Sequence, residues 1–281
     1  CFFIEADGKK ILYTGDFRNH GRKGKLTDKI TGRLSKHIDA VIIEGTNINR
    51  NQEKINTEEN IENEIIEKVK NKIGINLIML GSQNIDRIVS IYKATSKMKK
   101  ILVVDIYTAN ILATLSKYAK IPYPSSNFKN IKVIFTQKLC RKLELEGKKD
   151  NILKLSKLKI TKEEIETNKD NIMMIVKNSM LEEIGNIKGI ENGTFIYSMW
   201  EGYLEKSTAL LQFIERHKLE FIKIHTSGHA NNNFIMKFIK EINPKMIIPI
   251  HTNYPEKFEM FGKNVKVLND NQEIEIVWNS T

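Results

Sequence analysis

The sequence contains few cysteines, no long apolar run and no secretion signal, and each absence excludes a class of protein. Its two cysteines, Cys1 and Cys140, cannot form a disulfide framework and lack the spacing of a zinc finger. Eighteen consecutive apolar residues occur nowhere, so no membrane-spanning helix is expected. The N-terminus also lacks the basic-then-apolar pattern of a signal peptide. We therefore expect a cytoplasmic protein without a membrane partner.

The composition is that of a globular protein. The 281 residues suffice for one large or two medium domains, and 41% of them are apolar while 28% are charged. The chain opens at Cys1-Phe-Phe-Ile-Glu5, which has the pattern of the middle of a strand, and it has no initiator Met. We expect it to be a portion of a longer protein.

The chain carries a net charge of +11. A basic surface attracts polyanions, of which nucleic acid is the usual one. The alternative is that the richness in Lys, Ile and Asn reflects an AT-rich genome. Charge alone therefore favours nucleic-acid binding but leaves it open.

Apolar periodicity predicts an α/β protein. The stretch 19–31 is polar and glycine-rich and is expected to be a loop. Strands and helices alternate through the middle of the chain, which is typical of a parallel sheet with right-handed crossovers. Strands are expected at 2–4, 10–13, 40–43, 77–80, 101–104, 132–135, 172–176, 194–198, 221–225, 246–250, 265–268 and 273–277, and helices at 57–72, 85–98, 108–118, 204–217 and 232–242.

Three of the six histidines lie at the ends of two strand-like segments near the C-terminus. His225 and His229 follow the apolar run 221–224, and His251 follows the run 246–250 after an intervening amphipathic helix. This pattern indicates a βαβ unit, and open α/β sheets bind ligands at the carboxyl ends of their strands. A metal or a phosphate is the expected ligand.

Two acidic residues follow predicted strands in the first fifty residues. Asp16 comes after Gly15 at the end of a strand, where its carboxylate could bridge metal ions. Glu44 ends an apolar strand, where it could orient a histidine or accept a proton. The alternative for both is a turn or capping carboxylate.

The turn Thr226-Ser-Gly-His-Ala230 precedes a helix and has the composition of an anion pocket. Backbone N–H groups at a helix start, together with the Ser227 hydroxyl and an imidazole, can bind phosphate. Neutral imidazole also makes His251 a candidate metal ligand. The alternative is an ordinary cap beside a histidine that faces solvent.

Two further groups lie in the middle block. Ser82, in a turn before a helix, and Arg87, one helical turn later, could hold a phosphate, although a simple helix cap explains the same pattern. Trp200 and Tyr203 could stack on a base, but we favour their packing at a domain junction.

Taken together, these residues resemble the metallo-β-lactamase superfamily, and within it the β-CASP nucleases related to ribonuclease J. The segment 11–18 is similar to that superfamily's fourth metal motif, and the segments 39–47, 226–230 and 248–252 are similar to the three β-CASP motifs. Residues 83–87 resemble a helix start of the inserted β-CASP domain. The resemblance covers essentially the whole chain, but the HxHxDH signature that supplies most zinc ligands is absent from it.

The resemblance implies a partial αββα sandwich with an inserted α/β domain. Residues 1–50 and 201–281 would form the metallo-β-lactamase part and residues 51–200 the β-CASP domain. It also implies two Zn²⁺ ions per intact site and single-stranded RNA as the substrate. Asp16 would bridge the ions and His251 would bind one of them.

The remaining implied roles concern the phosphate. His229, steadied by Glu44, would contact the scissile phosphate or protonate the leaving oxygen. The groups expected to hold a phosphate of the substrate are His225, Ser227, Gly228, Ser82 and Arg87.

The expected function is that of a zinc-dependent phosphodiesterase, an exo- or endoribonuclease of RNA processing, in the intact protein. Without the HxHxDH ligands, the chain alone is expected to be inactive and to form no stable dinuclear zinc site. The alternative is a catalytically degenerate β-CASP protein that binds nucleic acid or acts as a scaffold. The sequence is compatible with a homo-oligomer and does not distinguish it from a monomer.

Overall fold

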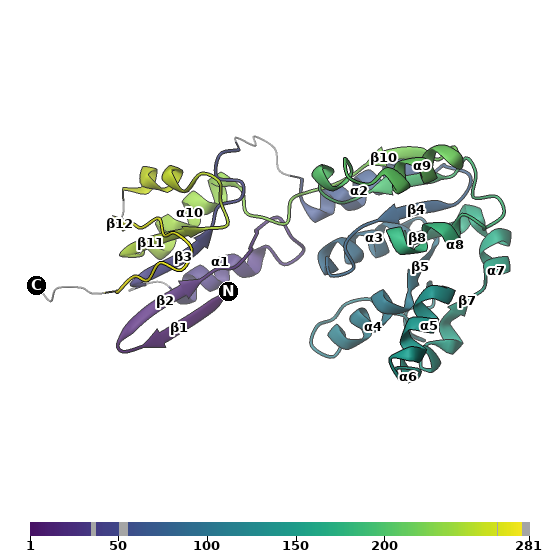
Figure 1. Cartoon of the computed structure of the whole chain (residues 1–281), viewed down its shortest axis with the longest axis horizontal. Coiled ribbons are helices and arrows are strands. Elements are labelled where there is room, and N and C mark those ends of the chain that lie inside the picture. Colours follow the sequence, from purple (N-terminus) through teal and green to yellow (C-terminus); the bar gives the residue numbers. More distant parts are fainter. Residues whose placement is uncertain (35–37, 51–55, 263, 277–281) are drawn as a thin grey trace, which may run out of the picture. The chain divides into compact units, whose positions relative to one another are not determined.

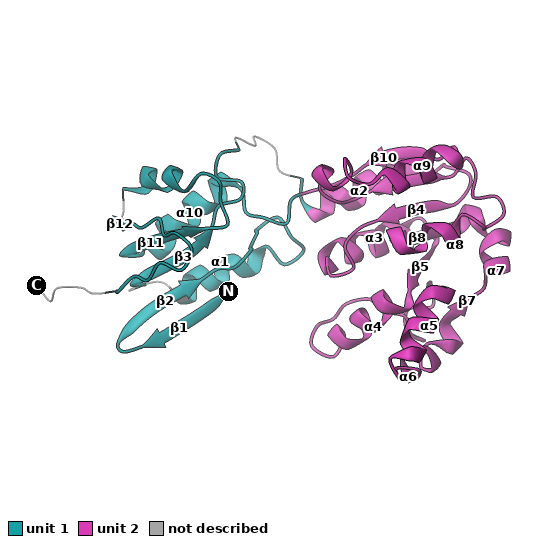
Figure 2. Ribbon diagram, in the orientation of Figure 1, with its two compact units in different colours: residues 1–57, 227–281 teal, residues 58–226 magenta. Residues whose placement is uncertain are grey.

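The computed structural model describes residues 1–34, 38–50, 56–262 and 264–276. The chain divides into two compact units, shown in different colours in Figure 2. Unit 1 comprises residues 1–57 and 227–281, and unit 2 comprises residues 58–226. Unit 2 is therefore inserted between two segments of unit 1 (Figure 1).

The expected domain boundaries differ from those of the units. The expected start of the middle domain at residue 51 falls in 51–55, which lie outside the described residues. Its expected end at residue 200 falls within unit 2. Residues 201–226 supply a helix and an edge strand that complete the sheet of this unit, which is why the unit extends further.

Unit 1 is built on one five-stranded sheet in the order β1-β2-β3-β11-β12. The first two strands form an antiparallel hairpin, and the other neighbouring pairs are parallel. The strands are β1 (Phe2–Ala6), β2 (Lys9–Tyr13), β3 (Ala40–Glu44), β11 (Met246–Ile250) and β12 (Asn264–Val265), and the helices are α1 (Lys25–Leu34), α10 (Asn232–Ile242) and the 3₁₀ helix η5 (Pro255–Phe261). The described residues thus provide one sheet of the expected sandwich.

Helix α10 packs its apolar face into the core of unit 1. Apolar residues recur along it every three or four positions, which places them on one side of the helix. Phe234 and Phe238 both contact Phe17, which follows β2. Asn231 caps the helix by accepting a hydrogen bond from the backbone N–H of Phe234 at 2.9 Å. The position of α10 next to β3 and β11 fixes the turn that precedes it.

Three expectations about unit 1 differ from the structure. Residues 25–34, largely within the expected loop, form α1, which contacts α10. The segment is a weak helix former, and tertiary contacts stabilise such helices. At the C-terminus, the strand expected at 265–268 is shortened to β12, and described residues 273–276 of the strand expected at 273–277 form none.

Unit 2 is a doubly wound α/β unit with a seven-stranded, fully parallel sheet in the order β10-β9-β4-β8-β5-β6-β7. The strands are β4 (Asn76–Met79), β5 (Ile101–Asp105), β6 (Ile131–Ile134), β7 (Lys159–Ile160), β8 (Ile172–Val176), β9 (Thr194–Tyr197) and β10 (Glu220–Lys223). The mixed α/β fold with parallel sheets that the sequence predicts is therefore confirmed.

Helices cover both faces of this sheet. The α-helices are α2 (Glu58–Val69), α3 (Ile85–Lys97), α4 (Ile106–Leu115), α5 (Gln137–Leu145), α6 (Asp150–Leu153), α7 (Lys162–Thr167), α8 (Leu181–Ile184) and α9 (Thr208–Arg216), and the 3₁₀ helices are η1 (Ser156–Leu158), η2 (Lys169–Asn171), η3 (Asn178–Met180) and η4 (Glu201–Tyr203). Helices α2, α3 and α4 share one core cluster, and α7, α8 and α9 share another. No helix in the described part of the chain is long and apolar enough to cross a membrane.

The prediction of a βαβ unit around His229 is wrong. Strand β10 pairs with β9 in the sheet of unit 2, whereas β11 pairs with β3 in the sheet of unit 1. The chain passes from one unit to the other between Thr226 and Ser227. The strand–turn–helix–strand pattern is the same whether or not its two strands share a sheet, and strand partners remote in the sequence decide between these cases.

Candidate metal centre

Parallel pairing of β2 and β3 brings the two acidic residues together. The pairing continues one residue past β2, where the backbone N–H of Thr14 donates to the carbonyl of Ile42 at 2.9 Å. Gly15 then turns the chain with a φ of +55°, a conformation that favours glycine. Asp16 follows this turn, and Glu44 is the last residue of β3. Both carboxylates therefore lie at the same edge of the sheet.

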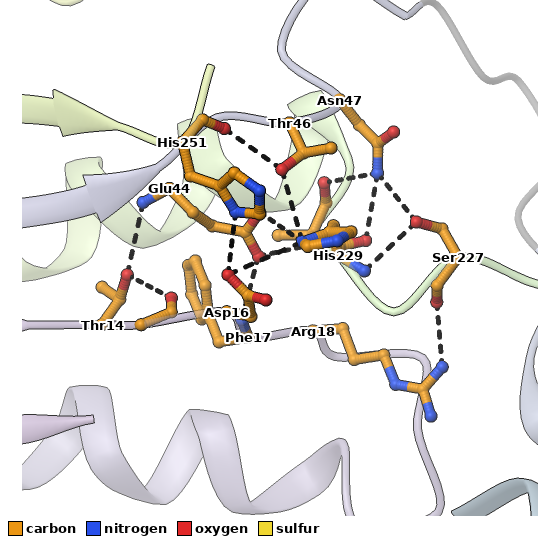
Figure 3. A network of polar contacts seen from close by, with 12 residues as sticks. Thr14, Asp16, Phe17, Arg18, Glu44, Thr46, Asn47, Ser227, His229 and His251 are labelled. Carbon is orange, nitrogen blue, oxygen red and sulfur yellow. Dashed lines mark hydrogen bonds and ion pairs between the residues drawn. The ribbon is translucent and has the colours of Figure 1, made fainter. Parts of the chain in front are cut away.

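Glu44 is fully buried, and both of its carboxylate oxygens accept hydrogen bonds (Figure 3). Its Oε1 accepts from the backbone N–H groups of Phe17 at 2.9 Å and Ala230 at 3.4 Å. Its Oε2 lies 2.9 Å from Nδ1 of His229. A buried carboxylate needs such partners, and this one links the end of β3 to the start of α10. Glu44 therefore orients His229.

The hydrogen bond to Glu44 raises the pKa of His229 above its ordinary value. Burial of the ring lowers the pKa, but the negative charges of Glu44 and Asp16 act with the hydrogen bond and outweigh it. Because Glu44 engages Nδ1, the Nε2 atom is the ring nitrogen left for a ligand or a substrate.

Asn47 fixes the backbone of the turn that carries His229. Its side-chain N–H₂ group donates to Oγ of Ser227 at 3.1 Å and to the carbonyls of His229 and Ala230 at 3.2 Å (Figure 3). The Ser227 Oγ in turn accepts from the backbone N–H of His229 at 3.1 Å. Asn47 is buried, so the turn is held from the protein interior.

Two cationic or ionisable groups bind the carbonyl of Ser227 in the same turn. Nη1 of Arg18 donates to it at 2.9 Å, and Nε2 of His20 lies 2.8 Å from it. The sequence alone predicts no role at the site for Arg18, His20 or Asn47. Only sequence position could have indicated two of them, because Arg18 and Asn47 each lie within three residues of a predicted site carboxylate.

Asp16 and His251 form the exposed side of the cluster. Oδ1 of Asp16 lies 3.0 Å from Nδ1 of His251, and both side chains are more than half exposed. His251 has a φ of +49°, a left-handed conformation that is uncommon for a histidine and that concentrates at functional sites. Thr46 stabilises it by donating its hydroxyl to the carbonyl of His251 at 3.1 Å.

Asp16, Glu44, His229 and His251 each offer a ligand atom, and these four atoms lie within 4.8 Å of one another. Carboxylate oxygens and imidazole nitrogens are ordinary Zn²⁺ ligands, so the donor set fits zinc. The two oxygens of Glu44 are engaged by hydrogen bonds. Asp16 and His251, which are more than half exposed, are the donors most open to a metal ion, and Nε2 of His229 is the ring nitrogen that Glu44 does not engage.

The structure brings together six of the nine predicted site residues, five of them in one polar network and the sixth, Gly228, in the turn that carries two of those five. Asp16, Glu44, Ser227, His229 and His251 lie in one polar network, and Gly228 belongs to the same turn. His225, Ser82 and Arg87 belong to unit 2.

Arg87 is placed differently from the phosphate-binding expectation. Its side chain is fully buried and forms an ion pair with Glu58, with Nε 3.0 Å from Oε2. The guanidinium also donates to Ser198 and to the carbonyl of Thr226 at 3.3 Å. A buried arginine bonded in this way has no surface to offer a phosphate, so its observed role is structural.

Trp200 and Tyr203, which we expect to pack at a domain junction, follow β9 in unit 2. They are 53% and 56% exposed and contact each other edge to face, with ring centroids 5.2 Å apart.

The structure is that of an α/β protein with a group of possible metal ligands at one edge of the sheet of unit 1. Comparison with known families then matches residues 216–267 to the Zn-dependent metallo-hydrolase RNA specificity domain. This segment contains Ser227, His229 and His251, and the match supports membership of the metallo-β-lactamase superfamily.

A solved structure, a protein of unknown function from Enterococcus faecalis, is similar with a TM-score of 0.71 and 19% sequence identity. The similarity covers 96% of this chain and 59% of that one, so this chain spans less than two thirds of its length. At this identity the likeness concerns the fold alone. No curated protein matches the sequence.

Proposed function

We propose that the intact protein containing this chain is a zinc-dependent phosphodiesterase that cleaves RNA, similar to the β-CASP nucleases related to ribonuclease J. The observation that carries the proposal is the convergence of Asp16, Glu44, His229 and His251 within 4.8 Å, partly inside a segment that matches an RNA specificity domain. The inserted unit 2 corresponds to the proposed β-CASP domain.

Asp16 and His251 are the proposed protein ligands for zinc in this chain. Both are exposed, and their donor atoms already lie side by side. Bound zinc would supply an activated water and stabilise charge on the scissile phosphate. Two such ions need more ligands than these, and we propose that the intact protein supplies them and that this chain alone is inactive.

His229 is the proposed acid. Glu44 holds the proton on Nδ1 and favours the charged imidazolium, so Nε2–H can donate to a phosphate oxygen or to the leaving oxygen. The buried position of Glu44 prevents it from rotating away. This chain therefore provides a proton donor with a fixed orientation.

The turn before α10 is the proposed contact for a substrate phosphate. Ser227 and Gly228 precede the N-terminus of an eleven-residue helix, whose dipole favours an anion. Arg18 adds a positive charge on the same turn. His225, two residues before Ser227, remains a proposed phosphate contact. Ser82 of unit 2 also remains one, independently of this turn.

RNA is the proposed substrate. The net charge of +11 suits a polyanion, and the match at residues 216–267 is to a domain described by its RNA specificity. The backbone phosphates of an RNA strand would be attracted by the excess of lysine and arginine in this chain.

A cleavage assay tests this function. The intact protein is mixed with 5′-phosphorylated single-stranded RNA and zinc or manganese, and the products are resolved by length. We expect cleavage, with Asp16→Asn abolishing it and Glu44→Gln lowering it about 10- to 100-fold. Asp270→Asn, an exposed carboxylate elsewhere in unit 1, is the matched control and should cleave like the parent protein.

The outcomes separate the proposal from the scaffold alternative. RNA that is bound but never cleaved by the metal-loaded protein would support a binding or scaffold protein. Cleavage that survives in Asp16→Asn would show that the chemistry lies elsewhere.

A further inference from the structure

The sheet of unit 2 has a topological switch point. Strand β8 lies between β4 and β5. The connection from β4 to β5 runs through α3 on one face, and the connection from β8 to β9 runs through α8 on the other. Loops that leave neighbouring strand ends toward opposite faces open a crevice, and doubly wound sheets bind ligands there.

A cavity of about 550 Å³ occupies this place. Its walls include the turn 81–83 after β4, Asp105 at the end of β5 with Tyr107 just after it, and Lys177, Ser179 and Met180 after β8. A neighbouring cavity of about 730 Å³ shares Gln83, Tyr107, Leu139 and Lys142 with the first. Ligand pockets commonly enclose roughly 300–1,000 Å³, so each cavity is of ligand size.

A buried ion pair organises the floor of the crevice. Asp105 is buried, and its Oδ1 caps α4 by accepting from the backbone N–H of Thr108 at 2.9 Å. Its Oδ2 accepts from Nζ of Lys177 at 2.5 Å. The same ammonium lies 4.5 Å from the centre of the Tyr107 ring. Lys177 and Tyr107 are thus held in a fixed relation at the ends of adjacent strands.

The two cavities differ in chemistry. The first is lined by Lys138, Lys142 and Lys177 and by the hydroxyls of Ser82, Thr136 and Ser179, which together suit a phosphate. The second combines apolar residues of α4 and α5, among them Ile111 and Leu143, with polar and charged ones such as Asn110 and Glu146. Tyr107 borders both cavities and is 46% exposed, so its ring is accessible to a base.

We propose that this crevice binds a nucleoside 5′-phosphate, with its phosphate at the lysines of the first cavity and its base against Tyr107 and the second cavity. The nucleotide comes from one of two sources, a free nucleotide or one unit of an RNA strand. The proposal rests on unit 2 alone and does not depend on the phosphodiesterase activity or on the metal centre.

Calorimetric titration of the whole chain with AMP tests the site. EDTA is present, so that the metal centre of unit 1 takes no part. We expect saturable binding of one AMP per chain, weakened about five- to a hundredfold by Tyr107→Ala through loss of stacking. Tyr118→Ala is the matched control, because Tyr118 is 84% exposed and does not line either cavity.

The phosphate contact has its own variants. Lys138→Gln with Lys142→Gln should weaken AMP binding about tenfold, because charge-assisted contacts to the phosphate are lost. Lys120→Gln, an exposed lysine outside the crevice, should not. Asp16→Asn should also leave AMP binding unchanged, which separates this site from the proposed catalytic one.

A parallel titration with 5′-phosphorylated hexameric RNA identifies the source. RNA binding that Tyr107→Ala weakens assigns the crevice to a strand, and AMP binding without RNA binding assigns it to a free nucleotide. The absence of saturable binding of both, or binding that Tyr107→Ala and the lysine variants leave unchanged, would overturn the proposal.

Discussion

Glu44 and His229, separated by 185 positions in the sequence, form a hydrogen bond of 2.9 Å between a fully buried carboxylate and Nδ1 of the imidazole. Glu44 ends β3, and His229 precedes α10. The contact therefore joins the two segments of unit 1 that flank the insertion. It also fixes Nδ1 as the ring nitrogen of His229 that contacts Glu44, which leaves Nε2 as the other.

Replacing Glu44 by Gln should lower the pKa of His229 in the metal-free chain. The hydrogen bond to the carboxylate is the main cause of the raised value, and a neutral amide lacks the charge. Histidine titration by NMR measures this change. Glu191→Gln, an exposed carboxylate of unit 2, is the control. An unchanged His229 titration in Glu44→Gln would contradict the assigned orientation.

The same pair makes stability depend on pH. The pKa of His229 is higher in the folded chain than in the unfolded one, where it is about 6.5. The contribution of the pair to stability is therefore full below that pH and is lost as the pH rises through the folded-state value. Glu44→Gln should remove this dependence in denaturant titrations of the metal-free chain.

Arg87→Met should strongly destabilise unit 2. The substitution leaves the Glu58 carboxylate buried without its cation, which costs about 3–5 kcal/mol. Adding Glu58→Gln removes that charge and should restore part of the loss. Denaturation followed by circular dichroism gives the free energies, with Lys93→Met on the exposed side of α3 as the control. If the free energy of unfolding of Arg87→Met equalled that of the parent chain, the structural role of this arginine would be contradicted.

The Asp39 carboxylate should stabilise unit 1 at neutral pH, and this contribution to stability should be lost in acid. Burial raises the pKa of Asp39, but hydrogen bonds from the Lys245 ammonium and the Lys10 backbone N–H, with the charges of Lys245 and Lys9, outweigh it and lower the pKa below its usual value. The contribution is therefore present above pH of about 3.9 and is lost as the pH falls through the folded-state value.

Asp39→Asn is the corresponding variant. It should cost about 1–3 kcal/mol near pH 7, and the difference from the parent chain should shrink toward pH 3. Urea denaturation at both pH values measures it, with Asp270→Asn as the control. A difference between Asp39→Asn and the parent chain that is independent of pH would show that the carboxylate charge is not responsible.

The strand-end residues could be predicted from the sequence because their signal is local. An apolar run followed by Asp16, Glu44 or His251 indicates where a strand ends and which functional group follows it. The alternation of strands and helices likewise predicted the parallel sheet of unit 2. These inferences need only a window of neighbouring residues.

Contacts between remote segments could not be predicted in this way. The assignment of β10 and β11 to different sheets depends on β9 and β3, their strand partners. The anchoring of the His229 turn by Asn47 spans 182 positions. Helix α1 was missed because its own sequence is a weak helix former and its contact with α10 stabilises it.

Zinc titration of the metal-free chain by calorimetry, with Asp16→Asn and His251→Ala beside it, tests the metal centre most directly. The donor set predicts weak binding of one zinc ion per chain, lost in both variants, because the ligands for a stable dinuclear site are not all in this chain. No zinc binding, binding that both variants retain, or tight binding of two zinc ions per chain would contradict the account.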